Sequence, residues 1–179
     1  MAFLDDLSPE AREIGAVNTL VRENDLWVGY NTDWIGFKES LNGFIDASNP
    51  PRTAYLLGKG GAALAIEYAL RQMKIEPIYV SRKPGSADLA YDELGPNQFN
   101  ESVLLINCTP LGTYPNIKDK PNIPYTCIKS TTYAYDLVYN PEKTAFMKAA
   151  EKQGAKTMNG LNMLHGQAEA AWDLWGKNL

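Results

Sequence analysis

The sequence is poor in the residues from which metal sites are built. It holds two cysteines, Cys108 and Cys127, which do not form a CxxC pair, and one histidine, His165. Because structural zinc sites need four such ligands, usually in closely spaced pairs, this supply predicts no metal centre. Cys108 ends an apolar run that starts at Val103, so we interpret its thiol first as a small buried hydrophobe and only second as a reactive group.

Long apolar runs and basic stretches are also lacking. No segment approaches the ~18 apolar residues of a membrane-spanning helix, and residues 1–10 carry acids where a secretory signal would be basic and then apolar. The formal net charge is −4, with no basic run among aromatic residues, so a nucleic-acid partner has no electrostatic basis. These features predict a cytoplasmic protein that binds neither membranes nor nucleic acids.

What the sequence does contain is an ordinary globular composition. Hydrophobic residues make up 45% of it and charged residues 21%, which excludes a disordered or fibrous chain. The length of 179 residues allows one sizeable domain and an appendage, since a domain takes roughly 150 residues. We therefore expect two parts, residues 1–50 and residues 51–179, divided at the two prolines that precede Arg52.

Residues 1–50 are predicted to form a hairpin-helix appendage. Ser8 with proline at the next position is a typical helix start, and Asn24 and Asp25 favour a turn. Apolar residues at helical spacing then indicate a longer helix. The expected elements are a short helix over 9–13, hairpin strands over 17–22 and 26–30, and a helix over 33–45.

Residues 51–179 are predicted to form an α/β domain, a Rossmann-type open parallel sheet with helices on both faces. Strand and helix patterns alternate along this part, as they do in successive βαβ units. The weaker pattern over 83–99 indicates a short helix and a loop. The expected strands are 53–57, 77–80, 103–108 and 133–138, and the expected helices are 61–73, 142–153 and 160–175.

A glycine-rich turn joins the first strand of this domain to its helix. Residues 58–63 read GKGGAA, which is a GxGxxA pattern between a strand and a helix. Gly58 permits the tight turn, Gly60 lets the backbone approach a pyrophosphate, and Ala63 lets the helix pack closely. The helix start at Gly61 and Ala62 offers free N–H groups to phosphates. The alternative is a structural turn that binds nothing.

The end of the second strand indicates which dinucleotide would bind. NAD-binding chains normally carry an acid there for the ribose 2′-hydroxyl, whereas this chain has Ser81, Arg82 and Lys83. A guanidinium fork and an ammonium suit a 2′-phosphate, so the pattern favours NADP as the cofactor. The alternative is that Arg82 and Lys83 are solvated loop charges.

Six blocks in a fixed order make the chain similar to shikimate dehydrogenases. Each block alone is a weak signal, but together they extend over nearly the whole chain. The resemblance implies NADP-dependent, reversible reduction of 3-dehydroshikimate to shikimate, a step of aromatic amino-acid biosynthesis. The blocks are IGAVNT at 14–19, GYNTD at 29–33, the glycine loop at 58–63, NCTPLG at 107–112, YDLVYNP at 135–141 and GLNMLHGQA at 160–168.

The resemblance also implies roles for the residues that match the family's motifs. Asp33 matches the aspartate of a catalytic Lys–Asp pair. The other implied roles are substrate contact for Asn18, Asp33, Tyr139 and Gln167, adenosine-phosphate contact for Ser81, Arg82 and Lys83, and a border on the ribose and nicotinamide for Thr109, Leu137, Gly160 and Met163.

The lysine of that pair has no counterpart here. In the family it lies upstream of the first block, in a separate substrate-binding domain, and residues 1–13 contain no lysine. A carboxyl with a pKa of about 3.9 is a poor proton donor at neutral pH by itself. We therefore expect a chain without its substrate-binding domain, with little or no turnover, that acts on shikimate only when that domain is supplied.

Two alternatives stay open, as do smaller departures from the family. The chain could be a non-catalytic NADP-binding or sensing module, or an NAD-preferring quinate or shikimate dehydrogenase. Lys59 stands where the family usually has a small residue, and it either adds positive charge near the pyrophosphate or points into water. His165 is interpreted as structural. Exposed apolar surface on the hairpin and around Trp172 and Trp175 predicts self-association as a homodimer.

Overall fold

The computed structural model describes residues 4–82 and 88–176, and its main feature is a six-stranded sheet in the order β6-β5-β4-β7-β8-β9. Every neighbouring pair is parallel. This confirms the Rossmann-type open parallel sheet expected after residue 50. The strands are β4 (Thr53–Leu57), β5 (Glu76–Ser81), β6 (Leu89–Ala90), β7 (Val103–Asn107), β8 (Tyr133–Asp136) and β9 (Lys156–Asn159).

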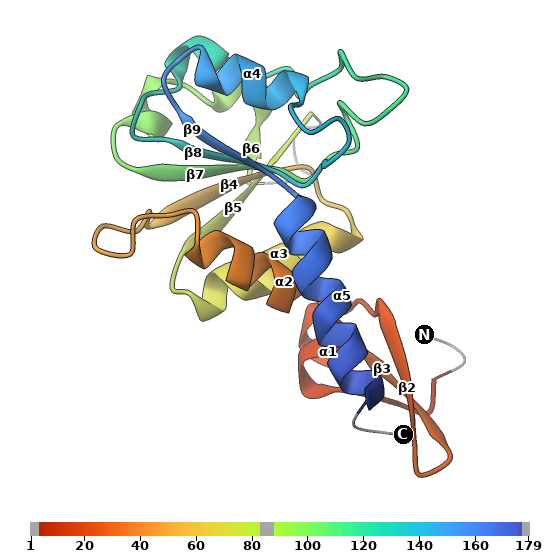
Figure 1. Cartoon of the computed structure of the whole chain (residues 1–179). Coiled ribbons are helices and arrows are strands. Elements are labelled where there is room, and N and C mark those ends of the chain that lie inside the picture. The colour runs from red at the N-terminus through yellow and green to blue at the C-terminus, as the bar shows by residue number, and fades with distance from the viewer. Residues whose placement is uncertain (1–3, 83–87, 177–179) are drawn as a thin grey trace.

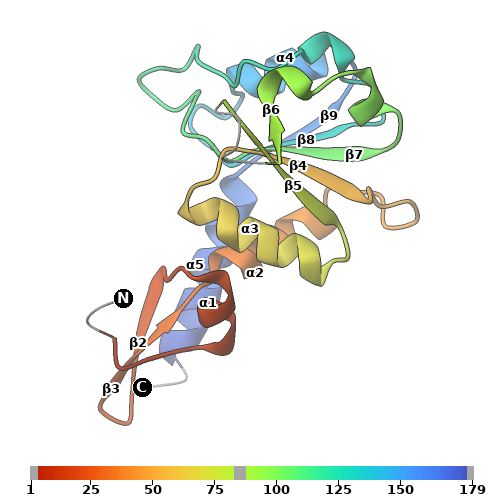
Figure 2. The same cartoon turned by 180° about the vertical axis from the view of Figure 1, so that it is seen from behind.

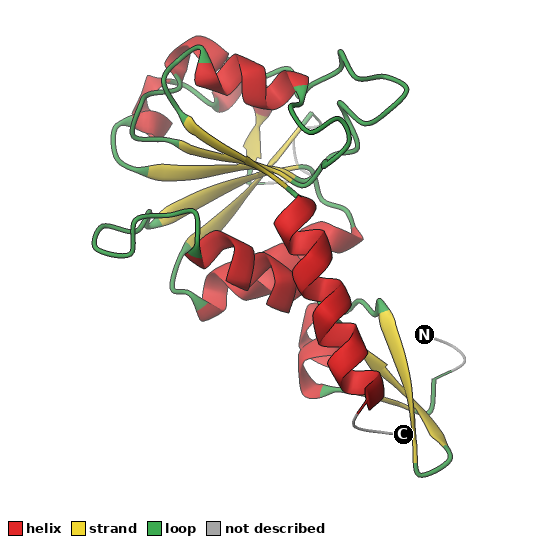
Figure 3. Cartoon of the chain, in the orientation of Figure 1, coloured by secondary structure: helices red, strands yellow, loops and turns green. Residues whose placement is uncertain are grey.

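Helices cover both faces of this sheet, as predicted (Figure 3). Side chains alternate between the faces along each strand, so Leu56 packs in the core under α2 and α3, while Leu57 packs in the core under α4. Figure 2 shows α3 from the side opposite to Figure 1. The helices are α2 (Asp33–Asn42), α3 (Gly61–Gln72), α4 (Ala145–Glu151), α5 (Leu161–Gly176) and the 3-10 helices η1 (Tyr91–Glu93), η2 (Pro96–Phe99) and η3 (Tyr125–Cys127).

The N-terminal residues form a small sheet of their own, in the order β1-β3-β2. The predicted hairpin is present, with Asn24 and Asp25 at φ angles of 47° and 69°, the left-handed conformation that a two-residue hairpin turn requires. Ser8 caps the short helix because its side chain accepts a hydrogen bond from the N–H of Ala11 at 3.1 Å. The elements are β1 (Asp6–Leu7), α1 (Pro9–Ile14), β2 (Thr19–Glu23) and β3 (Leu26–Tyr30).

Helix α5 connects the large sheet to the small one (Figure 1). It crosses α2 at glycines: a Cβ atom on Gly36 would lie 2.4 Å from the carbonyl oxygen of Met163, and one on Gly166 would lie 3.0 Å from the Cα of Gly36. At its far end the indole Nε1 of Trp175 donates to the carbonyl oxygen of Leu20 at 2.9 Å. One continuous helix thus fixes the position of the small sheet relative to the large one.

Helix α2 packs on the large sheet although its residues precede position 50. Phe37 and Leu41 are fully buried in the same core as Leu56 and Tyr135, and the Phe37 and Tyr135 rings meet edge-on at 5.2 Å between centroids. The division into residues 1–50 and 51–179 stays a prediction. In space, α2 belongs to the layer that covers the large sheet.

Several predicted boundaries differ from the observed ones. The helix expected over 33–45 ends at Asn42, and the helix expected over 142–153 begins only at Ala145 because Thr144 is its cap. Strands β1, β6 and β9 were not expected, since β1 and β6 are two residues long and β9 lacks an apolar run. No helix in the described part of the chain combines the length and the apolar character needed to cross a bilayer.

Candidate functional site

A crevice opens where the strand order reverses, at the carboxyl ends of β4 and β7. From β4 the chain proceeds outward to β5 and β6, then returns to β7 and proceeds outward the other way. Ligands of open α/β sheets bind at such switch points. Two adjoining cavities, of about 300 and 370 Å³, lie there and share Ala62, Leu137 and Tyr139 in their walls.

The glycine loop lines the larger of these two cavities. Gly58 has a φ angle of 101°, and a Cβ atom on it would lie 2.8 Å from Cγ2 of Thr109, so only glycine fits. A Cβ atom on Gly60 or Gly61 would meet nothing within 4 Å. The backbone at the start of α3 therefore faces open space, which is the shape and polarity of an anion cradle.

Two buried polar residues hold the opposite wall of this cavity. Oδ1 of Asn107 accepts hydrogen bonds from the hydroxyl of Thr109 at 2.6 Å and from its N–H at 3.1 Å, while Nδ2 donates to Asp136 at 2.8 Å. Asp136 also accepts from the N–H of Val138 at 3.1 Å and from the Thr144 hydroxyl at 2.5 Å. These hydrogen bonds hold Thr109, one of the residues predicted to contact the cofactor, beside Gly58.

Burial has the largest effect on the pKa of Asp136, the acid of that network. It raises the pKa of Asp136 from 3.8 to about 6, against the opposing effect of the hydrogen bonds from Thr144, Val138 and Asn107. This role of Asn107 and Asp136 was not predicted from the sequence. The available signal was that two neighbouring buried strands each end in a polar residue that can satisfy the other.

The smaller cavity collects the residues that the family resemblance assigned to substrate: Asn18, Asp33, Tyr139 and Gln167 all line it. Nδ2 of Asn18 donates to Oδ1 of Asp33 at 2.9 Å, and Oδ1 of Asn18 accepts from the N–H of Thr32 at 2.8 Å. The Thr32 hydroxyl contacts Oε1 of Gln167 at 3.4 Å. Segments far apart in the sequence thus meet through one polar network.

Asp33 is the carboxyl group among the residues that line this cavity. Burial raises its pKa above the ordinary value, and the hydrogen bond from Asn18 partly opposes that rise. Among the described residues Asp33 forms no ion pair. The nearby lysine of the same helix, Lys38, lies with its Nζ 5.8 Å from the ring centroid of Trp34.

Residues at and just before the start of α5 line the smaller cavity. Gly160 approaches β8 so closely that a Cβ atom on it would lie 2.2 Å from the carbonyl oxygen of Leu137. Met163 follows, buried except for 8% of its surface. Leu137, Gly160 and Met163, which the resemblance assigned to the nicotinamide side, therefore lie together on the border of the cavity.

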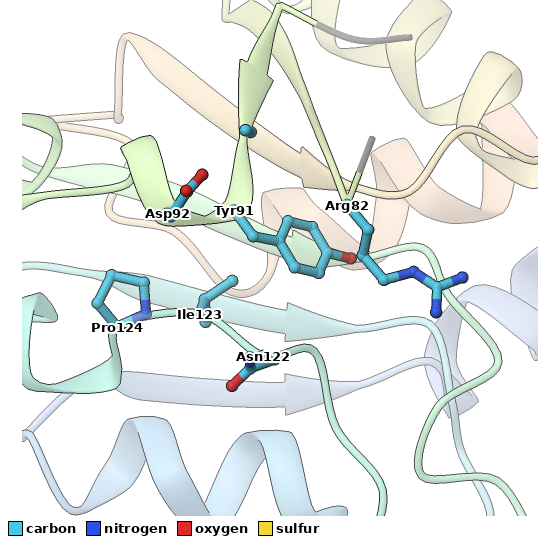
Figure 4. A pocket seen from close by; sticks show the side chains of 7 residues that line it. Arg82, Tyr91, Asp92, Asn122, Ile123 and Pro124 are labelled. Carbon is cyan, nitrogen blue, oxygen red and sulfur yellow. The ribbon is translucent and has the colours of Figure 1, made fainter. Parts of the chain in front are cut away.

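A third cavity, of about 640 Å³, lies beyond the end of β5 (Figure 4). Arg82 is exposed at its rim, and the ring of Tyr91 points toward the Arg82 side chain. Burial raises the pKa of the Tyr91 hydroxyl, and the charge of Arg82 opposes that rise. Ser81 ends β5 beside it, whereas Lys83 lies outside the described residues. The cavity's other lining residues are Ala90, Asp92, Asn122, Ile123 and Pro124.

Cys108 and His165 are the remaining candidate groups. Cys108 lines the larger switch-point cavity, but burial raises the pKa of its thiol far above the ordinary value, so it is not a thiolate. His165 is exposed on α5. Over residues 4–82 and 88–176, no cluster of three or more His, Cys, Asp or Glu side chains could hold a metal ion.

Comparison with known proteins identifies relatives along almost the entire chain, although no family model matches it. A shikimate dehydrogenase (NADP(+)) of Carboxydothermus hydrogenoformans is 39% identical over 187 residues, which are 97% of this chain and 66% of that protein. One from Clostridium botulinum is 37% identical over 187 residues, 99% of this chain and 71% of that protein.

Solved structures agree. Shikimate 5-dehydrogenase from Thermus thermophilus, in complex with NADP(H) and shikimate, superposes with a TM-score of 0.83 at 35% identity, covering 99% of this chain and 69% of that one. The chain spans about two thirds of the length of the curated relatives that it matches. The resemblance read from the six sequence blocks is confirmed: this chain belongs to the shikimate dehydrogenase family.

Proposed function

We propose that this chain is the NADP-binding part of a shikimate dehydrogenase, an oxidoreductase that reversibly reduces 3-dehydroshikimate to shikimate. The observation that carries the proposal is the continuous crevice at the switch point. One end is an open glycine loop, the other end is a carboxyl group with polar partners, and Leu137 and Tyr139 border both. A dinucleotide and a small polar substrate require such an arrangement, in which they meet end to end.

The residues of the cofactor end fit NADP. The open space at Gly60 and Gly61 accommodates a pyrophosphate against the start of α3, and the exposed guanidinium of Arg82 suits a 2′-phosphate. When bound, the reduced nicotinamide supplies the hydride. The proposed cofactor residues are Gly58, Gly60, Gly61, Ala62, Ala63, Ser81, Arg82, Lys83, Thr109, Leu137, Gly160 and Met163.

The substrate end orients a hydroxylated ring and handles a proton. Asn18 and Gln167 bind substrate hydroxyls, and Tyr139 covers the substrate from the side of the cavity that faces the cofactor. Asp33 holds a proton more readily than an ordinary carboxyl because burial raises its pKa. We infer that the alkoxide formed on reduction takes up its proton at this end of the crevice, where Asp33 lies.

Full turnover needs more than Asp33. The family resemblance pairs the aspartate with a lysine, but among the described residues Asp33 forms no ion pair. Lys38 of the same helix lies over Trp34. We therefore propose that the 179-residue chain binds NADP but reduces 3-dehydroshikimate slowly or not at all by itself. The same observation favours the second candidate, a non-catalytic NADP-binding module.

Binding titrations test the first part of this proposal. Calorimetry with the whole chain should show saturable binding of NADP, and roughly a hundredfold weaker binding of NAD. Arg82→Ala should lower that preference about tenfold, because a charged hydrogen bond is worth about 1.5–3 kcal/mol. Failure of NADP to bind would refute the proposal, and a preference for NAD that Arg82→Ala leaves unchanged would favour an NAD-linked quinate or shikimate dehydrogenase.

Adding the remaining part of a relative separates the two candidates. The upstream third of a shikimate dehydrogenase, supplied as a second polypeptide, should restore NADPH oxidation by 3-dehydroshikimate. An Asp33→Asn variant of this chain serves as the control and should stay inactive. If addition leaves turnover at zero while NADP binds, the binding-module interpretation is favoured. The predicted cytoplasmic location and homodimer stay predictions.

A further inference from the structure

Lys59 occupies an unusual place in the glycine loop. It is the second residue of the GxGxxA pattern, and its exposed side chain extends toward β5, where Nζ lies 5.0 Å from the ring centroid of Tyr79. This contact is a cation–π interaction. The ammonium group of Lys59 thus lies over the ring of Tyr79 while the side chain stays exposed.

The neighbouring carboxylate does not neutralise this lysine. Oε2 of Glu67 accepts from the Tyr79 hydroxyl at 2.7 Å, and Oε1 of Glu67 accepts from Nε and Nη2 of Arg71 at 3.1 and 3.0 Å. Burial and the bond to Glu67 raise the pKa of Tyr79, so the ring stays neutral. In the described part of the chain, Lys59 forms no ion pair. Its charge is available to an anion.

The sheet register places this charge at the end of the second strand. Leu57 pairs with Val80, and the N–H of Gly58 donates to the carbonyl oxygen of Val80 at 3.0 Å. Lys59 follows Gly58 directly, as Ser81 and Arg82 follow Val80. Since neighbouring strands lie about 4.8 Å apart, the two segments leave the sheet side by side.

Lys59 and Arg82 approach this point from opposite faces of the sheet. Tyr79, over which Lys59 lies, packs in the core beneath α3. Arg82 lines the cavity that contains Tyr91, which belongs to the core on the α4 side. The end of the second strand is where the adenosine ribose of a dinucleotide lies. A ribose phosphate there would have a cation on either side.

We propose that Lys59 is a second specificity-determining residue for NADP, which contacts the 2′-phosphate opposite Arg82. This inference rests on the proposed function, and it concerns a residue to which the family resemblance gives no role. The inference also predicts different effects on NADP and NAD. A lysine on the pyrophosphate would strengthen NADP and NAD equally, whereas a lysine on the 2′-phosphate strengthens NADP alone.

Lys59→Met tests the inference, because it removes the positive charge and keeps an unbranched apolar side chain. Lys59→Met should weaken NADP about tenfold, as the loss of one charged contact predicts, and should weaken adenosine 2′-monophosphate by a similar factor. NAD and adenosine 5′-monophosphate should be unaffected. The matched control is Lys156→Met, since Lys156 lies over the ring of Tyr133 at 5.2 Å, at the amino edge of the sheet. It should change none of the four affinities.

Each outcome separates this inference from the proposed function. Equal losses for NADP and NAD in Lys59→Met would overturn the inference, and so would no loss for either. A wild-type chain that binds no NADP would instead overturn the proposed function. Tyr79→Leu provides a second variant, with Tyr79→Phe as its control. Removing the ring should lower the NADP-to-NAD preference about threefold by loosening Lys59, while Tyr79→Phe should preserve it.

Discussion

The two ends of the crevice are built in different ways. The cofactor end is formed by one strand, its turn and the next helix, so that Gly58 to Ala63 are neighbours in sequence as well as in space. The proposed substrate end joins residues from three elements: Asn18 lies just before β2, Asp33 begins α2, and Gln167 lies on α5. The first end depends on local backbone conformation, whereas the second depends on how α5 crosses α2. Variants can therefore damage one end without the other.

The largest effect is expected at Gly160, which packs against Leu137, a residue that lines both cavities. Gly160→Ala would place a methyl group 2.2 Å from the carbonyl oxygen of Leu137, so β8 and α5 would have to move apart. We expect a loss of about 3 kcal/mol in the free energy of unfolding, measured by urea denaturation, together with impaired NADP binding.

The matched control for that variant is Gly61→Ala. A Cβ atom there would meet nothing within 4 Å, so the free energy of unfolding should change by less than about 0.5 kcal/mol. NADP should nevertheless bind more weakly, because the methyl group enters the space of the pyrophosphate. Equal stability losses in both glycine variants would contradict the difference that we infer between a packed wall and an open cradle.

The second prediction concerns the buried network behind the cofactor end. The pKa of Asp136 rises from 3.8 in the unfolded chain to about 6 in the folded one, so the folded state holds the proton more tightly. Stability should therefore fall as pH rises from about 4 to about 6, by roughly 1–3 kcal/mol. Asp136→Asn has no group to titrate and should flatten this slope in urea denaturation across that range. An unchanged slope in the variant would assign it to other groups.

These differences also explain what the sequence could reveal. Strand β4 and the turn at Gly58 were predicted with the observed bounds, because a buried apolar run and a glycine pattern are local signals. The bond between Asn107 and Asp136 joins residues 29 apart, so it is set by the pairing of β7 with β8 and not by the residues around either side chain. Strand β9 was missed for the same reason: its residues are KTMN, and only pairing with β8 makes them a strand.

The third prediction concerns whether a substitution at the substrate end changes NADP affinity at the cofactor end. Asp33→Asn keeps the shape of the side chain and removes its charge, so NADP affinity should stay within about twofold. Because burial raises the pKa of Asp33, its ionised form is disfavoured in the folded state. The variant should therefore be as stable as the wild type at neutral pH, or slightly more stable. A large loss of NADP affinity would show that the ends are coupled.

The smallest effect is expected at the far end of α5. Trp175→Phe removes the indole N–H that donates to Leu20 and keeps an aromatic ring, so thermal unfolding should report a loss of about 0.5–1 kcal/mol. Trp172→Phe is the control, because Trp172 is 73% exposed, and its stability should not change. Neither variant should alter NADP affinity, since Trp172 and Trp175 lie at the opposite end of α5 from Met163, the α5 residue proposed to border the cofactor. If Trp175→Phe weakened NADP binding while Trp172→Phe did not, the small sheet would be coupled to the cofactor end through α5, and the substrate end could not be treated as a separate unit.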